Sequence, residues 1–333
     1  MIGWGGSIHA GNFSHLLGLE RPKSEKFLVG DPLEGDRLIA TTGRSRWTRS
    51  PSLCTGSFWI CSQPSSPIRA PTSSSSPAQG AGYAPGDWVM GLNKIEEFST
   101  LAPDAFMHRI DATLTPSVTH YLSSMGAVGL TAWFGVSEIM KPEAGQTLLV
   151  SGAAGAVGSM VGQLARLRGA RVVGIAGGPE KCARLIDRFG FDAAIDYRGR
   201  DLDALSGAIG AACPQGIDLV FENVGGIGLD ATLLHINQKA RIILCGLISE
   251  YNGAPHGTRN LWQLIVKTAT MRGYLVSEFV DRFPEGSQAI ADLIGQGKLV
   301  FDEHIDDGID QAFNAFMRLF DGSNQGKMLL KLI

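Results

Sequence analysis

The chain has 333 residues, which corresponds to about two domains at roughly 150 residues each. Hydrophobic residues make up 44% and charged residues 18%, a composition that supplies a sizeable core and excludes disorder throughout. The net charge of -3 argues against a general nucleic-acid-binding protein, which usually carries a basic face. Glycine is unusually frequent, with 43 residues, so the positions of the glycines are the first feature to follow.

The cysteine count and the apolar segments indicate in which compartment the protein is expected. Five cysteines are an odd number in a long chain and contain no Cys-x-x-Cys pair, so we expect neither a disulfide framework nor a metal site. Polar residues such as His9 and Asn12 interrupt the apolar start that a signal peptide requires. No stretch reaches the roughly 18 apolar residues of a membrane span. These features predict a cytoplasmic protein without a membrane or nucleic-acid partner.

The first quarter of the chain differs from the rest. Residues 41–80 contain no Asp or Glu but include 11 Ser and 5 Pro, and such a composition predicts an irregular region over 1–80. Ordinary globular sequence begins near Tyr83, with a short strand expected over 88–91. Small and apolar residues over 122–140 favour helices at the entry to a second domain.

Residues 146–276 alternate between apolar strands and amphipathic helices. The near-continuous Val, Ile and Leu content of the strands indicates that both of their faces are covered. This alternation predicts an α/β fold with a doubly wound parallel sheet of the Rossmann type. The expected strands are 147–150, 171–175, 193–195, 219–222, 241–245 and 271–276. A helix over 309–320 and a terminal strand over 328–333 follow.

The strongest chemical motif lies directly between the first of these strands and a helix. Gly152, Gly155 and Gly158 are spaced three apart, which suits a tight turn, close approach of backbone amides to a pyrophosphate, and close packing of helix on strand. A glycine trio alone is a weak signal in a glycine-rich chain, but its strand–loop–helix context makes it strong. We therefore expect a dinucleotide site, against the alternative of a structural turn.

The end of the next strand indicates which dinucleotide binds. A site for NAD usually places Asp or Glu there to hold the ribose hydroxyls, whereas this chain has Gly177 and Gly178. The missing carboxylate leaves room for a 2′-phosphate, which Lys181 can neutralise. Glu180 is an acid that can turn inward, and Lys181 can also be an ordinary surface lysine. The pattern favours NADPH.

Five motifs occur in the order and at the separations typical of one family. They are Gly129–Gly135, Ala153–Gly158, Glu222–Gly226, Cys245–Asn252 and Asn324–Lys327. Together they resemble the zinc-independent medium-chain dehydrogenase/reductases, and within these the NADPH-dependent alkenal and alkenone double-bond reductases, the group of prostaglandin reductase and curcumin reductase. The resemblance covers Tyr83 to Ile333. It implies a Rossmann domain joined to a GroES-like substrate domain, and a homodimer formed by pairing of the sixth strands.

The resemblance also implies where each half of NADPH binds. Gly155 to Gly158 would line the pyrophosphate, and Lys181 and Tyr197 would contact the adenosine ribose and its 2′-phosphate. The further cofactor-binding positions that it implies are Gly152, Ala156, Val157, Asn223, Cys245, Gly246, Ile248, Tyr251, Tyr274, Leu275, Val276 and Asn324. Alternatives remain open: Tyr197 can be a packing aromatic, Asn223 can cap its turn, and Cys245 can be a small buried hydrophobe.

The expected reaction is zinc-independent reduction of the C=C bond of an α,β-unsaturated ketone or aldehyde, a small-molecule substrate. Hydride goes to the β-carbon, and the enolate that forms is then protonated. Tyr251 is the candidate catalytic residue, because a phenol can hydrogen-bond the carbonyl or donate the proton, although a structural tyrosine is the alternative. His120 and His256 are weaker candidates for proton relays. An NADPH:quinone oxidoreductase and a non-catalytic NADPH-binding protein are the other functions considered.

The amino-terminal part departs from the family. Its opening substrate-domain motif is not found, and Asp31-Pro32 is the nearest fragment. We therefore expect three parts: an irregular region over 1–80, a partial GroES-like domain from 81–123 plus 301–333, and an NADPH-binding Rossmann domain over 124–300. Residues 1–80 are then a divergent terminus, an irregular cover or an altered reading frame, and loss of one wall of the substrate cleft would impair activity.

Overall fold

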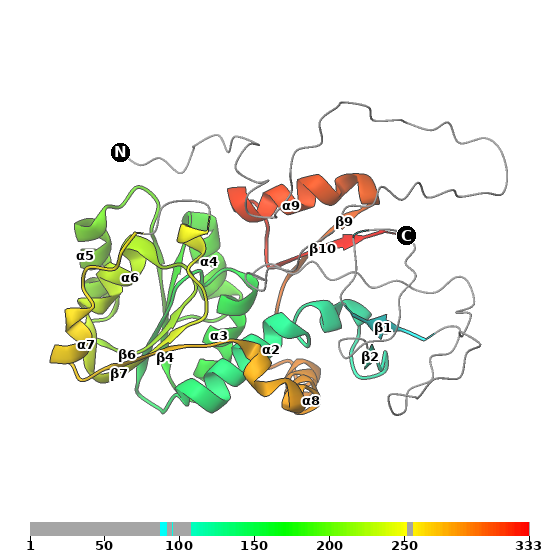
Figure 1. The fold of residues 1–333 in the computed structure, drawn as a ribbon, viewed down its shortest axis with the longest axis horizontal. Helices are drawn as coiled ribbons and strands as arrows, with labels where there is room; N and C mark the ends of the chain where they lie inside the picture. Colours follow the sequence, from blue (N-terminus) through cyan, green and yellow to red (C-terminus); the bar gives the residue numbers. More distant parts are fainter. Residues whose placement is uncertain (1–86, 92–94, 96–107, 252–255, 333) are drawn as a thin grey trace, which may run out of the picture. The chain divides into compact units, whose positions relative to one another are not determined.

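The structure is a computed structural model that describes residues 87–91, 95, 108–251 and 256–332 (Figure 1). The expected irregular region over 1–80 lies outside these residues. Every strand of the expected sheet lies within them.

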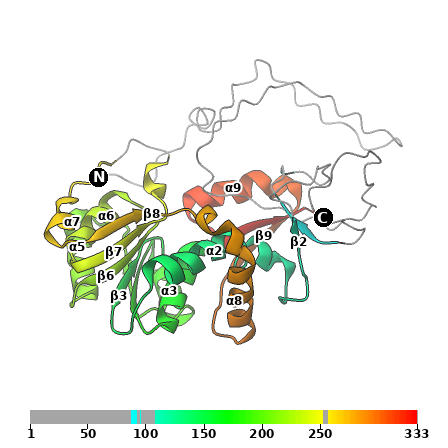
Figure 2. The ribbon, with the colours of Figure 1, turned by 60° about the horizontal axis from the view of Figure 1, so that its bottom comes forward.

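Six parallel strands form the central sheet, in the order β5-β4-β3-β6-β7-β8. Figure 2 labels β3, β6, β7 and β8 of this sheet. They are β3 (Thr147–Val150), β4 (Arg171–Ala176), β5 (Ala193–Asp196), β6 (Ile217–Glu222), β7 (Ile236–Leu244) and β8 (Thr270–Gly273). The order reverses at β3 and β6, which lie side by side with Leu149 paired to Val220. The predicted doubly wound parallel sheet is confirmed, and its carboxyl edge at β3 and β6 is where such sheets bind ligands.

Helices cover both faces of the sheet, and alternation of side chains along each strand explains why. In β3, Leu148 and Val150 join the core under one helical layer, whereas Leu149 joins the core under the other. The first layer contains α2 (Ala127–Phe134), α3 (Ala156–Leu167), α4 (Pro179–Asp187) and α8 (Phe283–Gly295), and the second contains α5 (Leu202–Ala212) and α6 (Gly226–Leu233).

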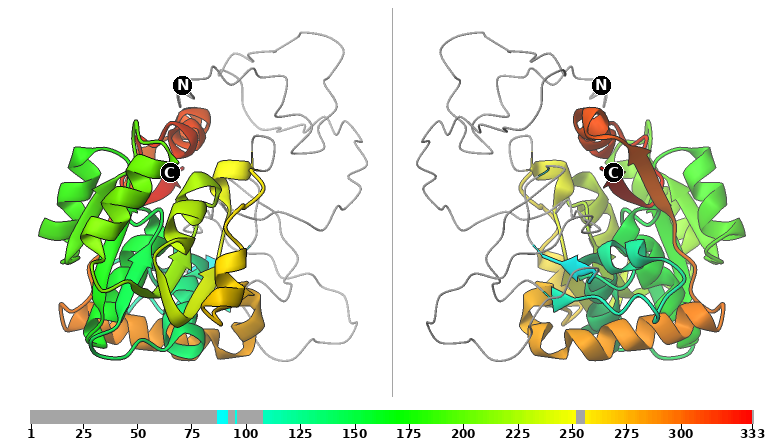
Figure 3. Two further views of the ribbon diagram at one scale, coloured as in Figure 1. Left: turned by 90° about the vertical axis from the view of Figure 1, so that its left-hand side faces the viewer. Right: turned by 90° about the vertical axis from the view of Figure 1, so that its right-hand side faces the viewer.

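Smaller elements complete the described part of the chain. β1 (Val89–Met90) pairs antiparallel with β2 (His108–Arg109), and β9 (Glu303–Asp307) pairs parallel with β10 (Lys327–Lys331). α9 (Ala312–Asp321) packs beside β10, as the two views of Figure 3 show. The remaining elements are α7 (Trp262–Val266), a π-helix over Gly135–Met140, and 3₁₀ turns over Val118–Leu122, Ile248–Glu250, Val276–Arg282 and Ile309–Gln311.

Several boundaries differ from the sequence-based expectation, and three of them differ most. The strand expected over 271–276 ends at Gly273, because Leu275 caps the 3₁₀ turn that follows. The strand expected to begin at Arg241 begins at Ile236. The helix expected from Ile309 begins at Ala312, after one 3₁₀ turn. In each case the element is present and only its end is displaced.

Candidate functional site

The loop between β3 and α3 carries the regularly spaced glycines at the carboxyl edge of the sheet. Gly152 has a φ of +58°, a left-handed conformation that glycine adopts without steric cost. A Cβ atom on Gly158 would lie 2.5 Å from the carbonyl oxygen of Gly152 and 2.8 Å from Cα of Ala153. Both neighbours are backbone atoms that cannot move aside, so only glycine lets the helix begin this close to the strand.

The amino end of α3 presents backbone donors to its surroundings. Its N-cap residue is Gly155, which has no side chain to accept from the first-turn N–H groups, and α3 runs for 12 residues. The first N–H groups of a helix have no partner within the helix, and the helix dipole adds partial positive charge there. Such an end attracts phosphate groups. Ala156 and Val157 lie in this first turn.

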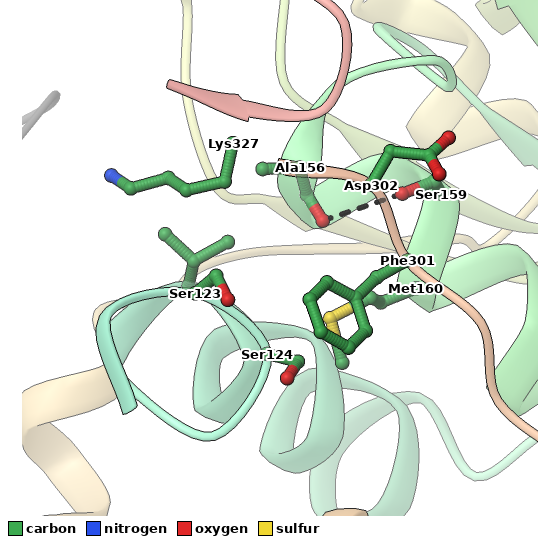
Figure 4. Close-up of a pocket in the computed structure, with 9 residues that line it drawn as sticks. Ser123, Ser124, Ala156, Ser159, Met160, Phe301, Asp302 and Lys327 are labelled. Atoms are coloured by element: carbon green, nitrogen blue, oxygen red, sulfur yellow. Dashed lines mark hydrogen bonds between the residues drawn. The ribbon is translucent and has the colours of Figure 1, made fainter. Parts of the chain in front are cut away.

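A small pocket lies beside this first turn (Figure 4). Its lining residues are Ser123, Ser124, Val128, Ala156, Ser159, Met160, Phe301, Asp302 and Lys327. The buried Oγ of Ser124 has no hydrogen-bond partner among the residues that the structure describes. Burial lowers the pKa of the Lys327 ammonium to about 8. The sequence motif at 324–327 contains Lys327, but no role for it follows from the sequence.

At the other end of the candidate site, Gly177 and Gly178 follow β4 and lie against the loop after β5. A Cβ atom on Gly177 would lie 3.0 Å from Oη of Tyr197, and one on Gly178 would lie 3.2 Å from a guanidinium nitrogen of Arg198. The structure therefore places Tyr197 at the turn of Gly177 and Gly178, which has no acid in its own sequence. Arg198 is an exposed second cation at this turn that sequence reasoning missed, although it directly follows Tyr197.

Two acids lie near this turn, and each accepts hydrogen bonds from the protein itself. Oδ1 of Asp196 accepts the N–H of Gly178 at 2.7 Å and that of Arg198 at 3.0 Å, so it holds the two loops together. Exposed Glu180 accepts from the side-chain amide of Gln325 at 3.2 Å. Lys181, half-buried in α4, donates from Nζ to the carbonyl oxygen of Gly322 at 2.6 Å. Cations and a phenol at a glycine turn suit a phosphate monoester.

Asn223 lies at the end of β6 and is joined to the glycine loop. Its side-chain amide donates to the carbonyl oxygen of Ser151 at 2.7 Å, and its backbone N–H donates to Oγ of Ser151 at 2.8 Å. The side chain thus braces two loops of the site, whereas the sequence suggested a cap of its own turn as the alternative.

The segment after β7 folds against the same turn. The N–H groups of Cys245 and Gly246 donate to the carbonyl oxygen of Glu222 at 2.9 and 3.1 Å, and that of Ile248 donates to Asn223 at 3.2 Å. Oη of half-buried Tyr251 accepts from the N–H of Leu247 at 3.3 Å, which leaves the phenol proton for another acceptor.

The thiol of Cys245 is not set up as a nucleophile. Burial raises its pKa to about 12, so the thiolate is scarce at neutral pH. Neighbouring Tyr274 is buried, and its hydroxyl has no hydrogen-bond partner among the described residues. Burial also raises the pKa of this phenol. Leu275 is 68% exposed, and Val276 begins the next 3₁₀ turn.

Asn324 and the two histidines are held by near neighbours. The side-chain amide of Asn324 donates to the carbonyl oxygen of Gly326 at 3.0 Å, within its own turn. Nδ1 of His120 is hydrogen-bonded to Oγ1 of Thr115. Nε2 of His256 lies 2.9 Å from Oδ2 of buried Asp230. Hydrogen bonds therefore join the glycine loop, Asn223 and the 245–251 segment, and none within the described part of the chain joins these histidines to them.

The described residues contain no group of three or more His, Cys, Asp or Glu side chains that could hold a metal ion. Among the same residues, no helix combines the length and apolar character that crossing a membrane requires.

The glycine loop and the switch point at β3 and β6 define a Rossmann-type dinucleotide-binding protein. A family model described as zinc-binding dehydrogenase matches residues 156–292. The oxidoreductase YfmJ of Bacillus subtilis is 44% identical over 251 residues, which cover 74% of this chain and 73% of YfmJ. The chain belongs to the medium-chain dehydrogenase/reductase family, among its NADP-dependent reductases.

Two further relatives carry informative names. The 2-alkenal reductase (NADP(+)-dependent) of Nicotiana tabacum is 39% identical over 249 residues, which cover 74% of this chain and 72% of the relative. The crystal structure of CurA from Vibrio vulnificus in complex with NADPH matches with a TM-score of 0.70 and 37% identity, over 76% of each chain.

Proposed function

We propose that this protein reduces the C=C double bond of α,β-unsaturated ketones and aldehydes with NADPH. The observation that carries the proposal is the turn of Gly177 and Gly178, which has no acid in its own sequence. It lies beside Lys181, Tyr197 and Arg198, and it follows a strand of the sheet that also carries the glycine loop. Relatives named as an NADP-dependent 2-alkenal reductase and a CurA solved with NADPH support both the cofactor and the class of substrate.

The residues at the glycine loop fit the pyrophosphate of the cofactor. Gly158 lets α3 begin close against the backbone of Gly152 and Ala153, and the N-cap residue offers no competing side-chain acceptor. In the proposed complex, the backbone N–H groups of Ala156, Val157 and Gly158 hold the pyrophosphate, with Gly152 and Gly155 shaping the loop. These donors orient the cofactor across the carboxyl edge of the sheet.

At the adenosine end, Lys181, Tyr197 and Arg198 hold the ribose and its 2′-phosphate. The nicotinamide half lies along the segments after β6, β7 and β8 and against the returning carboxyl-terminal segment. The residues proposed to border it are Asn223, Cys245, Gly246, Ile248, Tyr251, Tyr274, Leu275, Val276 and Asn324.

NADPH, when bound, supplies the hydride that reduces the β-carbon of the substrate. The chain contributes binding, orientation and a proton donor. Tyr251 is proposed to donate a hydrogen bond to the substrate carbonyl oxygen, or to return a proton to the carbon next to it, since its oxygen already accepts from Leu247 and its proton is available. Cys245 takes no part as a nucleophile, because burial raises its pKa to about 12. No zinc ion is required for this chemistry.

We also propose the domain organisation and the assembly. The NADPH-binding domain spans 124–300, and 81–123 plus 301–333 belong to the GroES-like domain. β8 is one of the two edge strands of the sheet. Exposed apolar side chains lie before and after it in the chain, including Ile265 at 80% and Leu275 at 68%. Pairing of this edge with a second copy would bury them as a homodimer. The cytoplasmic location expected from the sequence stays a prediction.

A steady-state screen tests the function. The purified full chain is offered 3-nonen-2-one, a 2-alkenal and a quinone, each with NADPH and with NADH. We expect turnover of the enone and the alkenal with NADPH, with a much lower rate for NADH. Rapid NADPH oxidation with quinones alone would identify a quinone oxidoreductase. Tight NADPH binding without turnover of any of the three would identify a non-catalytic cofactor-binding protein.

A further inference from the structure

Glu222, at the end of β6, connects the loops that carry most of the candidate cofactor contacts. Its side chain is fully buried. Oε1 accepts a hydrogen bond from Oγ of Ser151 at 2.5 Å and from the N–H groups of Val224 and Gly225 at 2.7 and 2.8 Å. A single carboxylate oxygen therefore holds both the turn after β3 and the turn after β6.

Ser151 relays this connection to Asn223. Its hydroxyl accepts the backbone N–H of Asn223 at 2.8 Å, and its carbonyl oxygen accepts from the side-chain amide of Asn223 at 2.7 Å. Because a serine hydroxyl has one proton, and the short contact to Glu222 needs a donor, that proton is directed at Oε1. The hydrogen bonds thus run in one direction, from Asn223 through Ser151 to Glu222.

The segment after β7 is fixed to the same turn through the backbone. Cys245 and Gly246 donate to the carbonyl oxygen of Glu222 itself, and Ile248 donates to that of Asn223. A displacement of the turn after β6 would therefore move the segment that precedes Tyr251. Hydrogen bonds thus connect Glu222 to three loops of the site, those after β3, β6 and β7.

The other carboxylate oxygen of Glu222 shows that this residue is not part of an ion pair. Oε2 is buried and has no hydrogen-bond partner among the described residues. Burial raises the pKa of this carboxyl above its usual range. An apolar side chain at this position would avoid the cost of burying a carboxyl group. It would, however, leave the N–H groups of Val224 and Gly225 without their acceptor. What Glu222 supplies is an acceptor for loop donors.

We propose that Glu222 is a positioning residue for the cofactor, which sets the turn at Gly152 and the turn at 223–225 in the arrangement that binds the nicotinamide half of NADPH. It acts through Ser151 and Asn223. The inference rests on the proposed function, because it requires the cofactor site.

The test compares variants of the full chain in binding two ligands: NADPH, by the change in nicotinamide fluorescence, and 2′,5′-ADP, which lacks the nicotinamide half, by calorimetry. Glu222→Ala removes the acceptor, and Glu222→Gln keeps Oε1. Asp218→Ala is the matched control. Asp218 also lies on β6 and accepts a hydrogen bond from β3, from the N–H of Thr147, but it does so at the amino ends of the strands, away from the candidate site.

We expect E222A to raise the Kd for NADPH about tenfold and to change that for 2′,5′-ADP less than about twofold, with E222Q within about threefold of the wild type. D218A should leave both Kd values unchanged. Equal NADPH binding by E222A and the wild type overturns the inference, as does an equal loss of both ligands. If the wild type itself does not bind NADPH, the proposed function fails instead.

A milder substitution keeps the inference testable if E222A does not fold. Ser151→Ala removes only the hydroxyl between Asn223 and Glu222, and we expect it to weaken NADPH binding about fivefold. Ser206→Ala, which removes a half-buried hydroxyl bonded to His235 on the other helical layer, is its control. Identical NADPH binding by S151A, S206A and the wild type contradicts the positioning role.

Discussion

The ammonium of Lys181 donates a hydrogen bond to the carbonyl oxygen of Gly322 at 2.6 Å, although 141 residues separate the two. The contact joins the first turn of α4, at the turn of Gly177 and Gly178, to the end of α9. The lysine proposed to neutralise a 2′-phosphate is therefore also a bridge between distant segments. Its substitution should affect stability as well as cofactor choice.

The first prediction separates these two effects. Lys181→Gln and Arg198→Gln should each raise the KM for NADPH about tenfold, because each removes a cation from the proposed phosphate site, while the KM for NADH stays unchanged. Only K181Q should lower the melting temperature, since Arg198 is exposed and Lys181 is bonded to Gly322. Arg168→Gln, at the far end of α3, is the control. Equal effects on NADPH and NADH would contradict a 2′-phosphate site.

The second prediction concerns the space beside the glycine loop. Gly158→Ala places a Cβ atom 2.5 Å from backbone, so α3 must shift, and we expect the Kd for NADPH to rise more than about tenfold with a lower melting temperature. Gly155→Ala, with a contact at 3.1 Å, should fall between this variant and the wild type.

Gly207→Ala is the control for that series. Gly207 lies exposed within α5, and a Cβ atom there meets nothing within 4 Å. Alanine in a helix interior should raise the free energy of unfolding by about 0.5–1 kcal/mol and leave NADPH binding unchanged. Equal NADPH affinity in G158A and G207A would show that the loop does not hold the cofactor.

The third prediction tests Tyr251. Tyr251→Phe removes the phenol hydroxyl, which includes the proton and the oxygen that accepts from Leu247. It should lower kcat/KM for an enone about a hundredfold, with the Kd for NADPH within about twofold of the wild type. Tyr121→Phe, which removes a hydroxyl that donates to the carbonyl oxygen of Asp111 at 2.9 Å, should leave both unchanged. Stopped-flow hydride transfer and fluorescence titration measure the two quantities. An unchanged enone rate in Y251F would make the tyrosine structural.

The fourth prediction concerns pH. Burial lowers the pKa of Lys327 to about 8 in the folded protein, from 10.5 in an unperturbed lysine. Between these values the unfolded chain binds more protons, so the free energy of unfolding should rise with pH from about 8 to about 10.5, by about 3 kcal/mol. Lys327→Met should abolish this rise, whereas the exposed control Lys298→Met should keep it. Urea unfolding at a series of pH values measures it.

The sheet could be predicted because its strands are apolar on both faces, and because the segments between them have apolar residues at the spacing of a helix. β9 could not, because three of its five residues are acidic, and its pairing with β10 depends on chain brought together by the fold. The ends of strands were also predicted poorly. β8 ends at Gly273, and Leu275 and Glu278 cap the turn that follows. Apolar periodicity carries no information about such local hydrogen bonds.

Within the site, the glycine loop and the missing acid were readable from spacing alone. The contact of Ser151 with Glu222 was not, because the two residues are 71 positions apart and meet only once β3 and β6 become neighbours. A polar residue at the end of an apolar strand is the signal that was available for each of them. Arg198 was missed for a similar reason, since its proximity to Gly178 requires β5 to pair with β4.

The strand order has a consequence for how this enzyme can be altered. The strands on the proposed adenosine side, β4 and β5, lie together in one continuous stretch of chain, and those on the proposed nicotinamide side, β6, β7 and β8, lie together in the next. If these sites are as proposed, separate segments of the chain encode the preference for the 2′-phosphate of the cofactor and the chemistry at the substrate carbonyl. Exchange of 171–200 alone would convert the first trait and leave the second in place.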